Sequence, residues 1–331
     1  MTIKVGILGA GFIAGVHVRS LRSIKGVEIA AICDSAEEKA SRLAESVDPG
    51  PPVFTEFARM LESVEIDALY ICLPPFAHAG EVEAAAARGI HLFLEKPLGL
   101  DTRRARSMVR AIESAGVKSQ VGFQMRFQQG VKALKKAVDA GEAGKPVLFT
   151  GRYWTRMDGP PWWRDRSRSG GQILEQVIHI YDMACHFMGE AMPEKSEGHL
   201  ANVIHQASAD YTIEDLSVGL VRHPGGAASV ITGCNAVLEG NYIADFRIVY
   251  ENAVLDYRCT GKHWEIPDHS TLHIGGRMVL DVDETEDPYR KESEDFLRAI
   301  AEDTETCATA RCGLTAMELV ESVINAAGKS I

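Results

Sequence analysis

The sequence has no long hydrophobic run. Hydrophobic residues make up 46% of its 331 residues, but no apolar stretch approaches the ~20 residues that a helix needs to span a bilayer. The apolar stretch at residues 1–11 ends in glycines, where a secretory signal would continue. These absences argue against a membrane protein and favour a soluble protein of the cytoplasm.

Positively charged residues are fewer than negatively charged ones: there are 35 lysines and arginines and 46 aspartates and glutamates. The formal net charge is −11, and no basic cluster is interleaved with aromatic residues. The arginines at residues 103–106 and 164–168 form groups too short to follow a phosphate backbone. We therefore expect no nucleic-acid partner.

Paired cysteines are missing as well. The seven cysteines are an odd number, they are scattered, and none forms a C-x-x-C pair. Some lie in apolar, strand-like runs such as Ala30–Cys33. This pattern is typical of reduced thiols in a cytosolic protein, and it predicts neither a disulfide framework nor a metal site.

The first third of the chain alternates apolar runs with amphipathic stretches. The predicted strands are residues 3–8, 27–33, 68–73, 91–94 and 117–123. The predicted helices between them are residues 12–24, 35–46, 76–88 and 101–115. Strands that alternate with helices form a parallel sheet covered on both faces. Residues 1–124 are therefore predicted to be an α/β domain with a doubly wound parallel sheet.

The remaining residues, 125–331, have a different pattern. Several strand-like runs follow one another directly between residues 195 and 282, which predicts antiparallel pairing. The predicted helices of this part are residues 129–140, 172–188, 288–302 and 313–328. We expect an α+β domain with an open, mostly antiparallel sheet that binds substrate and forms oligomers.

A glycine-rich turn follows the first predicted strand. Gly9, Gly11 and Ala14 form a G-x-G-x-x-A pattern that opens a helix, and Asp34 ends the next strand, 20 residues after Ala14. In a Rossmann fold the glycines admit a pyrophosphate to the helix N-terminus, and the acid binds the ribose hydroxyls. Asp34 would repel a 2′-phosphate, so NAD is favoured over NADP. The alternative is an unrelated strand–helix turn in which Asp34 caps a helix.

Three later motifs strengthen this interpretation. Residues 73–78 read Leu-Pro-Pro-Phe-Ala-His, residues 95–97 read Glu-Lys-Pro, and a Gly-Gly pair precedes Glu175, His179 and Asp182. Together they resemble the glucose–fructose oxidoreductase and inositol dehydrogenase family (Gfo/Idh/MocA). In that family the position of Glu175 is most often aspartate and the position of Val177 is often glycine, so this chain departs from the pattern at two positions.

The resemblance implies a set of site residues. Together with the glycine-rich turn, it gives the cofactor-binding residues Gly9, Gly11, Phe12, Ile13, Ala14, Asp34, Leu73, Pro74, His78, Glu95, Lys96 and Gln124. It also implies a cis bond between Lys96 and Pro97. The predicted substrate-binding residues are Lys96, Arg126, Trp162, Trp163, Arg164 and His179. The tryptophans have an alternative role in packing an interface.

Hydride transfer needs a group that stabilises the reacting hydroxyl oxygen and a group that moves its proton. Lys96 fits the first role, and the alternative is an ordinary surface lysine. On one continuous helix Glu175, His179 and Asp182 share a face, so His179 fits the second role. Glu175 would orient it and Asp182 would assist. The alternatives are a solvated helix face or a metal site, for which no third ligand is evident.

These expectations combine into one function. The chain is predicted to be an NAD-dependent dehydrogenase acting on a CH–OH group of a sugar, sugar acid or cyclitol, without a metal. The resemblance implies a homodimer or homotetramer. Two alternatives remain open: a redox-neutral glycosidase or epimerase that retains NAD, and a non-catalytic dinucleotide-binding sensor.

Overall fold

The computed structural model describes residues 2–156, 159–189, 192–237, 242–259 and 268–329. The chain divides into two compact units. The first unit comprises residues 1–99, 103–124 and 287–314, and the second comprises residues 100–102, 125–286 and 315–331. The sequence placed everything after residue 124 in the second domain. The structure groups residues 287–314 with the first unit, because helix α10 (Pro288–Glu302) packs along helix α1 (Phe12–Arg22).

The first unit contains a six-stranded sheet in the order β3-β2-β1-β4-β5-β6. Every neighbouring pair is parallel, as predicted. The strands are β1 (Ile3–Leu8), β2 (Val27–Cys33), β3 (Val53–Phe54), β4 (Ala68–Ile71), β5 (His91–Leu94) and β6 (Ser119–Val121). The sequence did not predict β3, because a strand of two residues leaves no recognisable pattern.

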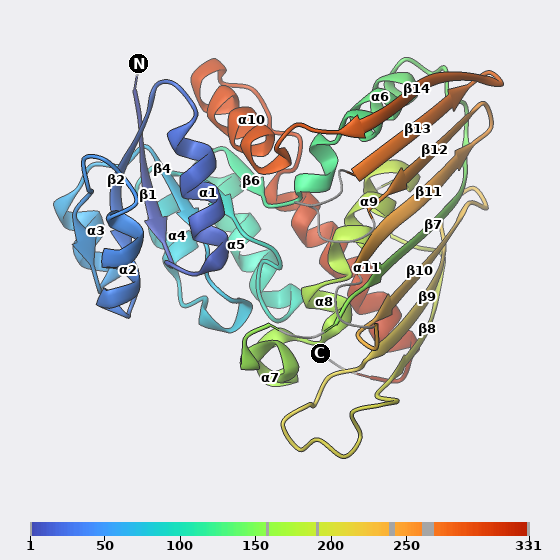
Figure 1. The fold of residues 1–331 in the computed structure, drawn as a ribbon, viewed down its shortest axis with the longest axis horizontal. Coiled ribbons are helices and arrows are strands. Elements are labelled where there is room, and N and C mark those ends of the chain that lie inside the picture. Colours follow the sequence, from blue (N-terminus) through green and yellow to red (C-terminus); the bar gives the residue numbers. More distant parts are fainter. Residues whose placement is uncertain (1, 157–158, 190–191, 238–241, 260–267, 330–331) are drawn as a thin grey trace. The chain divides into compact units, whose positions relative to one another are not determined.

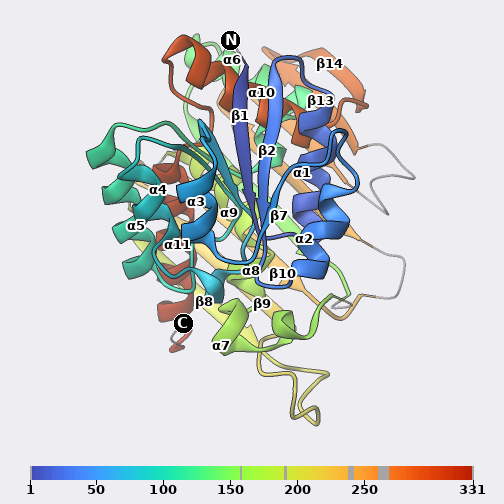
Figure 2. The same cartoon turned by 90° about the vertical axis from the view of Figure 1, so that its left-hand side faces the viewer.

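Helices cover both faces of this sheet. Helices α1 and α2 lie on one face, and α3, α4 and α5 lie on the other (Figure 2). The bounds of the last four are α2 (Glu37–Ala44), α3 (Phe57–Ser63), α4 (Glu81–Ala86) and α5 (Thr102–Ala115). Strand and helix residues such as Val5, Ile7, Ala14 and Phe296 are fully buried in a common core. Each large apolar side chain buried in this way contributes about 1.5–3 kcal/mol of transfer free energy, and this core fixes where the strands end.

The second unit is built on an eight-stranded sheet in the order β14-β13-β12-β11-β7-β10-β9-β8. The pairs are antiparallel except for β7 with β10, which is parallel. The strands are β7 (Pro146–Trp154), β8 (Lys195–Ala201), β9 (Leu216–Arg222), β10 (Ala228–Cys234), β11 (Ile243–Tyr250), β12 (Ala253–Arg258), β13 (Asp268–Ile274) and β14 (Arg277–Glu284). The predicted open, mostly antiparallel sheet is therefore confirmed.

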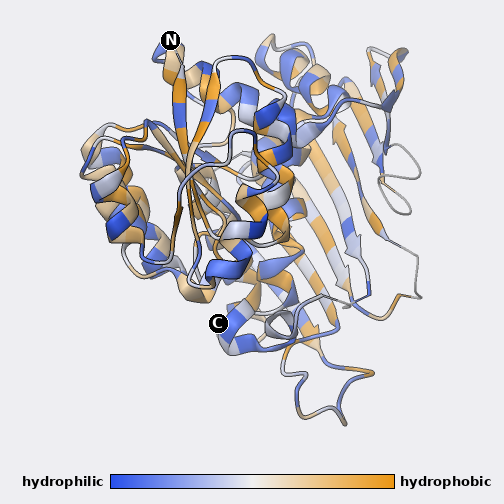
Figure 3. Ribbon diagram, turned by 60° about the vertical axis from the view of Figure 1, so that its left-hand side comes forward, coloured by the Kyte–Doolittle hydropathy of each residue, from blue (hydrophilic) through white to orange (hydrophobic). Residues whose placement is uncertain are grey.

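Helices pack on one face of the eight-stranded sheet (Figure 1). They are α6 (Gln129–Asp139), α8 (Gln172–Glu175), α9 (Ile178–Met188) and the part of α11 (Ala310–Ala326) that belongs to this unit. Burial alternates along strands such as β9 and β10. Hydrophobic and hydrophilic residues alternate along the strands accordingly (Figure 3), as expected for a sheet with one covered face. No helix in the described part of the chain is both long and apolar enough to cross a membrane.

The helix predicted over residues 172–188 is wrong in one respect. It is interrupted between α8 and α9, where the amide of Val177 bonds to the carbonyl of Gln172, five residues back, at 3.2 Å. Glu175 therefore lies at the end of a four-residue helix, and His179 lies in the first turn of the next helix. The regular spacing that placed these residues on one helix face does not apply across the break.

Candidate active site

The glycine-rich turn joins β1 to α1. Gly9 has a φ of +91°, and a Cβ atom built on it would lie 2.6 Å from the carbonyl oxygen of Cys72. Gly11 caps α1, and nothing lies within 4 Å of its hypothetical Cβ. The first-turn amides of a helix have no partner inside the helix. The open space over Gly11 therefore leaves these amides accessible to an anion such as a pyrophosphate.

Asp34 follows β2 and is tied to the turn. Its Oδ2 accepts a hydrogen bond from the amide of Ala10 at 2.8 Å, and its Oδ1 accepts one from the amide of Ala36 at 2.9 Å. Ala36 is the N-cap residue of helix α2, so the carboxylate holds both the glycine-rich turn and the residue that precedes this helix. Each carboxylate oxygen keeps acceptor capacity for a further donor such as a ribose hydroxyl.

The predicted cofactor-binding residues gather at one edge of the first sheet. All six strands are parallel, so their carboxyl ends share this edge, where open α/β sheets bind ligands. The residues that follow these ends are Gly9 after β1, Asp34 after β2, Leu73 and Pro74 after β4, Glu95 and Lys96 after β5, and Gln124 after β6. Phe12, which is 85% exposed, and Ile13 begin α1, and the fully buried Ala14 packs against the sheet.

His78 is fixed within the loop after β4. Its Nδ1 pairs with the Oε1 of Glu81, whose Oε2 accepts the amide of Ala79 at 2.7 Å. Burial acts to raise the pKa of Glu81, but the hydrogen bonds and charge of its partners hold it below the usual value. Glu81 therefore favours its ionised form, and its carboxylate ties His78 to the first residue of α4.

Lys96 begins the loop after β5. It is partly buried, and its bond to Pro97 is cis, as the resemblance implied. Its backbone amide lies 3.1 Å from Oε2 of Glu95, and the amide of Glu95 donates to the carbonyl of Ile71 at the end of β4 at 3.0 Å. The peptide that carries Lys96 is thus held by the neighbouring strand and by a buried carboxylate.

Glu175 and His179 lie in the second unit, and both are buried. The imidazole of His179 is nearly parallel to the ring of Tyr153, with their centroids 6.1 Å apart. Tyr153 lies on β7, so the sheet positions the histidine ring. The contact between Tyr153 and His179 depends on tertiary packing, so spacing along the chain does not predict it.

The structure joins Asp182 to Arg126 in a buried ion pair. Arg126 Nε and Nη2 donate to the two oxygens of Asp182 at 2.9 and 2.6 Å, and the side chains are only 2% and 1% exposed. The sequence had assigned Arg126 to substrate binding and Asp182 to an assisting role beside His179. Spacing along the chain does not reveal this pairing, because the two residues are 56 positions apart. Burial, together with the charges of Arg126 and Lys135, lowers the pKa of the neighbouring His186 to about 2, so its imidazole is neutral at pH 7.

The aromatic segment before α8 forms the short 3-10 helix η3 (Pro161–Arg164). Trp162 and Trp163 meet edge to face, with centroids 6.0 Å apart. Trp163 also packs against the buried Tyr211 and Ile213. The carbonyl of Arg164 accepts the amide of Thr212 at 2.9 Å. In this segment Trp163 and the Arg164 backbone anchor the chain around residues 211–213.

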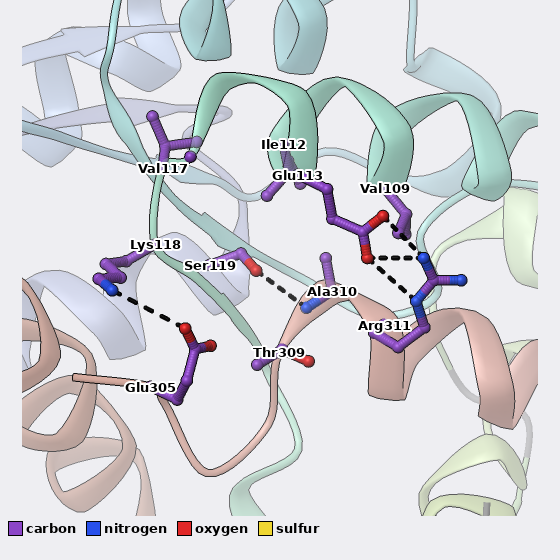
Figure 4. A pocket seen from close by; sticks show the side chains of 11 residues that line it. Val109, Ile112, Glu113, Val117, Lys118, Ser119, Glu305, Thr309, Ala310 and Arg311 are labelled. Atoms are coloured by element: carbon purple, nitrogen blue, oxygen red, sulfur yellow. Dashed lines mark hydrogen bonds and ion pairs between the residues drawn. The ribbon is translucent and has the colours of Figure 1, made fainter.

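A cavity of about 250 Å³ lies elsewhere in the first unit. Figure 4 shows it between α5 and the chain around residues 305–311. Arg311 is paired with Glu113 at 2.6 Å, and Lys118 lies 3.8 Å from Glu305. The cavity contains none of the predicted site residues, and its charges are neutralised within it.

Sequence reasoning missed two buried ionisable residues, His17 and Glu292. Both are fully buried. His17 lies on the inward face of α1 with Ala14, Val18 and Leu21. A charged or polar residue within such an apolar stripe is the signal that could have found it.

The comparisons with known proteins agree with this geometry. Residues 3–123 match the model of an oxidoreductase family with an NAD-binding Rossmann fold, and residues 131–256 match the GFO/IDH/MocA C-terminal domain. The chain is 31% identical over 241 residues to the uncharacterized oxidoreductase YrbE of Bacillus subtilis, covering 72% of this chain and 69% of that protein. The chain belongs to the Gfo/Idh/MocA family of oxidoreductases. As a member of it, the first unit is an NAD-binding domain.

Two other proteins match over nearly the whole length of the chain. The chain is 27% identical to an inositol 2-dehydrogenase of Rhizobium meliloti, covering 98% of this chain and 96% of that protein. A solved levoglucosan dehydrogenase in complex with NADH superposes with a TM-score of 0.87 at 19% identity, covering 99% and 97% of the two chains. This last likeness shows the fold alone.

Among the described residues, no group of three or more His, Cys, Asp or Glu side chains could hold a metal ion.

Proposed function

We propose that this protein is an NAD-dependent dehydrogenase that oxidises a carbinol carbon of a sugar, sugar acid or cyclitol. The observation that carries the proposal is the placement of Lys96 directly after β5, at the sheet edge where Asp34 anchors the glycine-rich turn. A lysine at the cofactor edge can polarise the hydroxyl of a substrate bound beside the nicotinamide. The name of the relative from Rhizobium meliloti supports a cyclitol or sugar as the substrate class.

Each proposed residue has a separate task. Lys96 polarises the substrate hydroxyl, and His179 takes up its proton. Glu175 orients the imidazole of His179. The ring of Tyr153 lies nearly parallel to this imidazole, with the two centroids 6.1 Å apart. Bound NAD supplies the hydride acceptor. The Arg126–Asp182 pair holds α9 in place rather than moving a proton, because each charge is already neutralised by the other.

We further propose a homodimer or homotetramer in the cytoplasm. The face of the eight-stranded sheet opposite Tyr153 carries Trp154, whose ring lies beneath the guanidinium of Arg152 at 4.7 Å, and Val230, which is 36% exposed. A partly apolar sheet face of this kind is suited to a second copy of the chain. Light scattering of the purified protein tests this, and a monomer at micromolar concentration would contradict it.

The catalytic proposal is tested by following NADH absorbance with a panel of inositols, aldoses and sugar acids. We expect steady NADH formation with at least one polyol. Lys96→Ala should lower kcat about a hundredfold, the loss usual for one group that stabilises developing negative charge. Lys25→Ala, a change at an exposed lysine of the same unit, is the matched control. No turnover across the panel, with NAD still bound, would overturn the proposal.

A further inference from the structure

His17 and Glu95 form a buried pair inside the first unit. Nε2 of His17 lies 2.7 Å from Oε1 of Glu95, and the side chains are 0% and 8% exposed. His17 comes from α1, three residues after Ala14 of the glycine-rich motif, and Glu95 directly precedes Lys96. The contact therefore links the helix that begins at the dinucleotide turn to the peptide that carries Lys96.

The Glu95 carboxylate is enclosed on several sides. Its Oε2 lies 3.1 Å from the amide of Lys96. A Cβ atom built on Gly122 would lie 2.7 Å from its Oε1 and 3.0 Å from its Cδ. The ring of Phe93 meets the imidazole of His17 edge to face, with centroids 4.8 Å apart. In this position the Glu95 carboxylate lies within hydrogen-bonding distance of both the His17 imidazole and the Lys96 amide.

Three other ionisable residues surround the pair: Tyr70 contacts the ring of His17, and Cys72 and Glu292 interact electrostatically with Glu95. Burial raises the pKa of Tyr70, Cys72 and Glu292, and the charge of Glu95 adds to this for Cys72 and Glu292. An ionised carboxylate accepts a hydrogen bond more strongly than a neutral acid does, so negative charge at this position favours the contact with His17.

We propose that His17 is a positioning residue: it holds the Glu95 carboxylate, and Glu95 holds the backbone of Lys96 at the cofactor edge of the sheet. The proposal rests on the proposed function, in which Lys96 acts on the substrate hydroxyl. Displacement of a catalytic group by about 1 Å can cost a hundredfold in rate. His17 thus acts on catalysis from inside the domain, through one carboxylate and without contact with substrate.

Three variants of the full-length protein test this. His17→Leu removes the donor but keeps an apolar filler in the core. His17→Gln restores a donor near the position of Nε2. Gly122→Ala leaves both residues intact, and its methyl group pushes the flexible end of Glu95 aside. Gly50→Ala is the control, because its Cβ would make only ordinary contacts in the same unit.

We expect His17→Leu and Gly122→Ala each to lower kcat tenfold to a hundredfold, while KM for the polyol changes less than about twofold, because substrate binding is not the step impaired. His17→Gln should recover most of the rate, and Gly50→Ala should match the wild type. Melting temperatures, measured alongside, identify losses caused by unfolding. If His17→Leu does not fold, Gly122→Ala and His17→Gln decide the question.

A second readout does not depend on turnover. The rate at which an amine reagent modifies Lys96, followed by peptide mass spectrometry, should change several-fold in His17→Leu and Gly122→Ala and stay unchanged in Gly50→Ala. Absence of wild-type turnover would count against the proposed function, whereas this labelling still tests the positioning role. Unchanged kcat and labelling in both variants, or a His17→Gln variant no better than His17→Leu, would overturn the inference.

Discussion

Replacing Asp182 with alanine should destabilise the protein strongly, because the buried guanidinium of Arg126 then loses its carboxylate partner. Asp182 accepts two hydrogen bonds from Arg126, at 2.9 and 2.6 Å, and both side chains are almost completely buried. Removing one partner of a buried pair costs about 3–5 kcal/mol, since the remaining charge loses its compensation. A folded domain is stable by about 5–15 kcal/mol, so Asp182→Ala should remove a large part of the total.

The double variant separates this cost from the net value of the pair. Replacing both residues with apolar side chains, as in Arg126→Met with Asp182→Leu, leaves no uncompensated charge and is often nearly neutral. Urea unfolding of the two single variants and the double variant gives the coupling energy. Glu197→Ala breaks a surface pair with Lys195 in the same unit, whose side chains are 49% and 58% exposed. This control should cost little stability, because solvent screens an exposed ion pair.

The outcome also decides between two roles for Asp182. A loss of stability in Asp182→Ala that the double variant recovers would establish a structural role. A loss of less than about 1 kcal/mol in Asp182→Ala, together with a large fall in kcat, would refute the argument and return Asp182 to the proton-transfer machinery.

Three further changes test other parts of the first unit. Asp34→Ala should weaken NAD binding about tenfold to a hundredfold, which is the contribution of one hydrogen bond to a charged group. It should also reduce the ratio between the affinities for NAD and NADP. The KM values for the two cofactors measure both effects. Gly9→Ala should lower the melting temperature and abolish NAD binding in a titration, because its Cβ would lie 2.6 Å from a carbonyl oxygen at φ +91°. Burial raises the pKa of Glu292 well above 4.5. The folded state therefore retains a proton that the unfolded state releases. As a result, the free energy of unfolding decreases as pH rises above about 4.5. Glu292→Gln should therefore gain stability over the wild type as pH increases, as read from melting temperatures across a pH series; a gap independent of pH would contradict this.

Local patterns correctly predicted which segments meet at one edge of the first sheet. The glycine-rich turn and Asp34 are encoded within the first 34 residues, and parallel strands then place the segments after β4 and β5 at the same edge. The sequence could predict this because each loop is fixed by its own strand and because the carboxyl ends of parallel strands necessarily coincide.

Contacts between distant residues could not be predicted in this way. Arg126 and Asp182 are separated by 56 positions, and His17 and Glu95 by 78. Which polar residue meets which depends on how buried surfaces pack. The break between α8 and α9 has the same origin, since no glycine or proline marks Gln176 or Val177. Regular helical spacing therefore holds between His179 and Asp182, which both lie on α9, but it does not extend back to Glu175.

Three buried or half-buried acids of the first unit share one arrangement. The carboxylates of Asp34, Glu81 and Glu95 each lie within hydrogen-bonding distance of a backbone amide in or beside a loop at the cofactor edge, at 2.7–3.1 Å. Two of them also engage a histidine, His78 or His17. A loop held by a charged acceptor loses little further entropy when a ligand binds, which is the advantage of preorganisation. Neutralising any of these acids should therefore loosen one ligand-binding loop and weaken binding or catalysis, while the apolar core beneath the sheet keeps the domain folded.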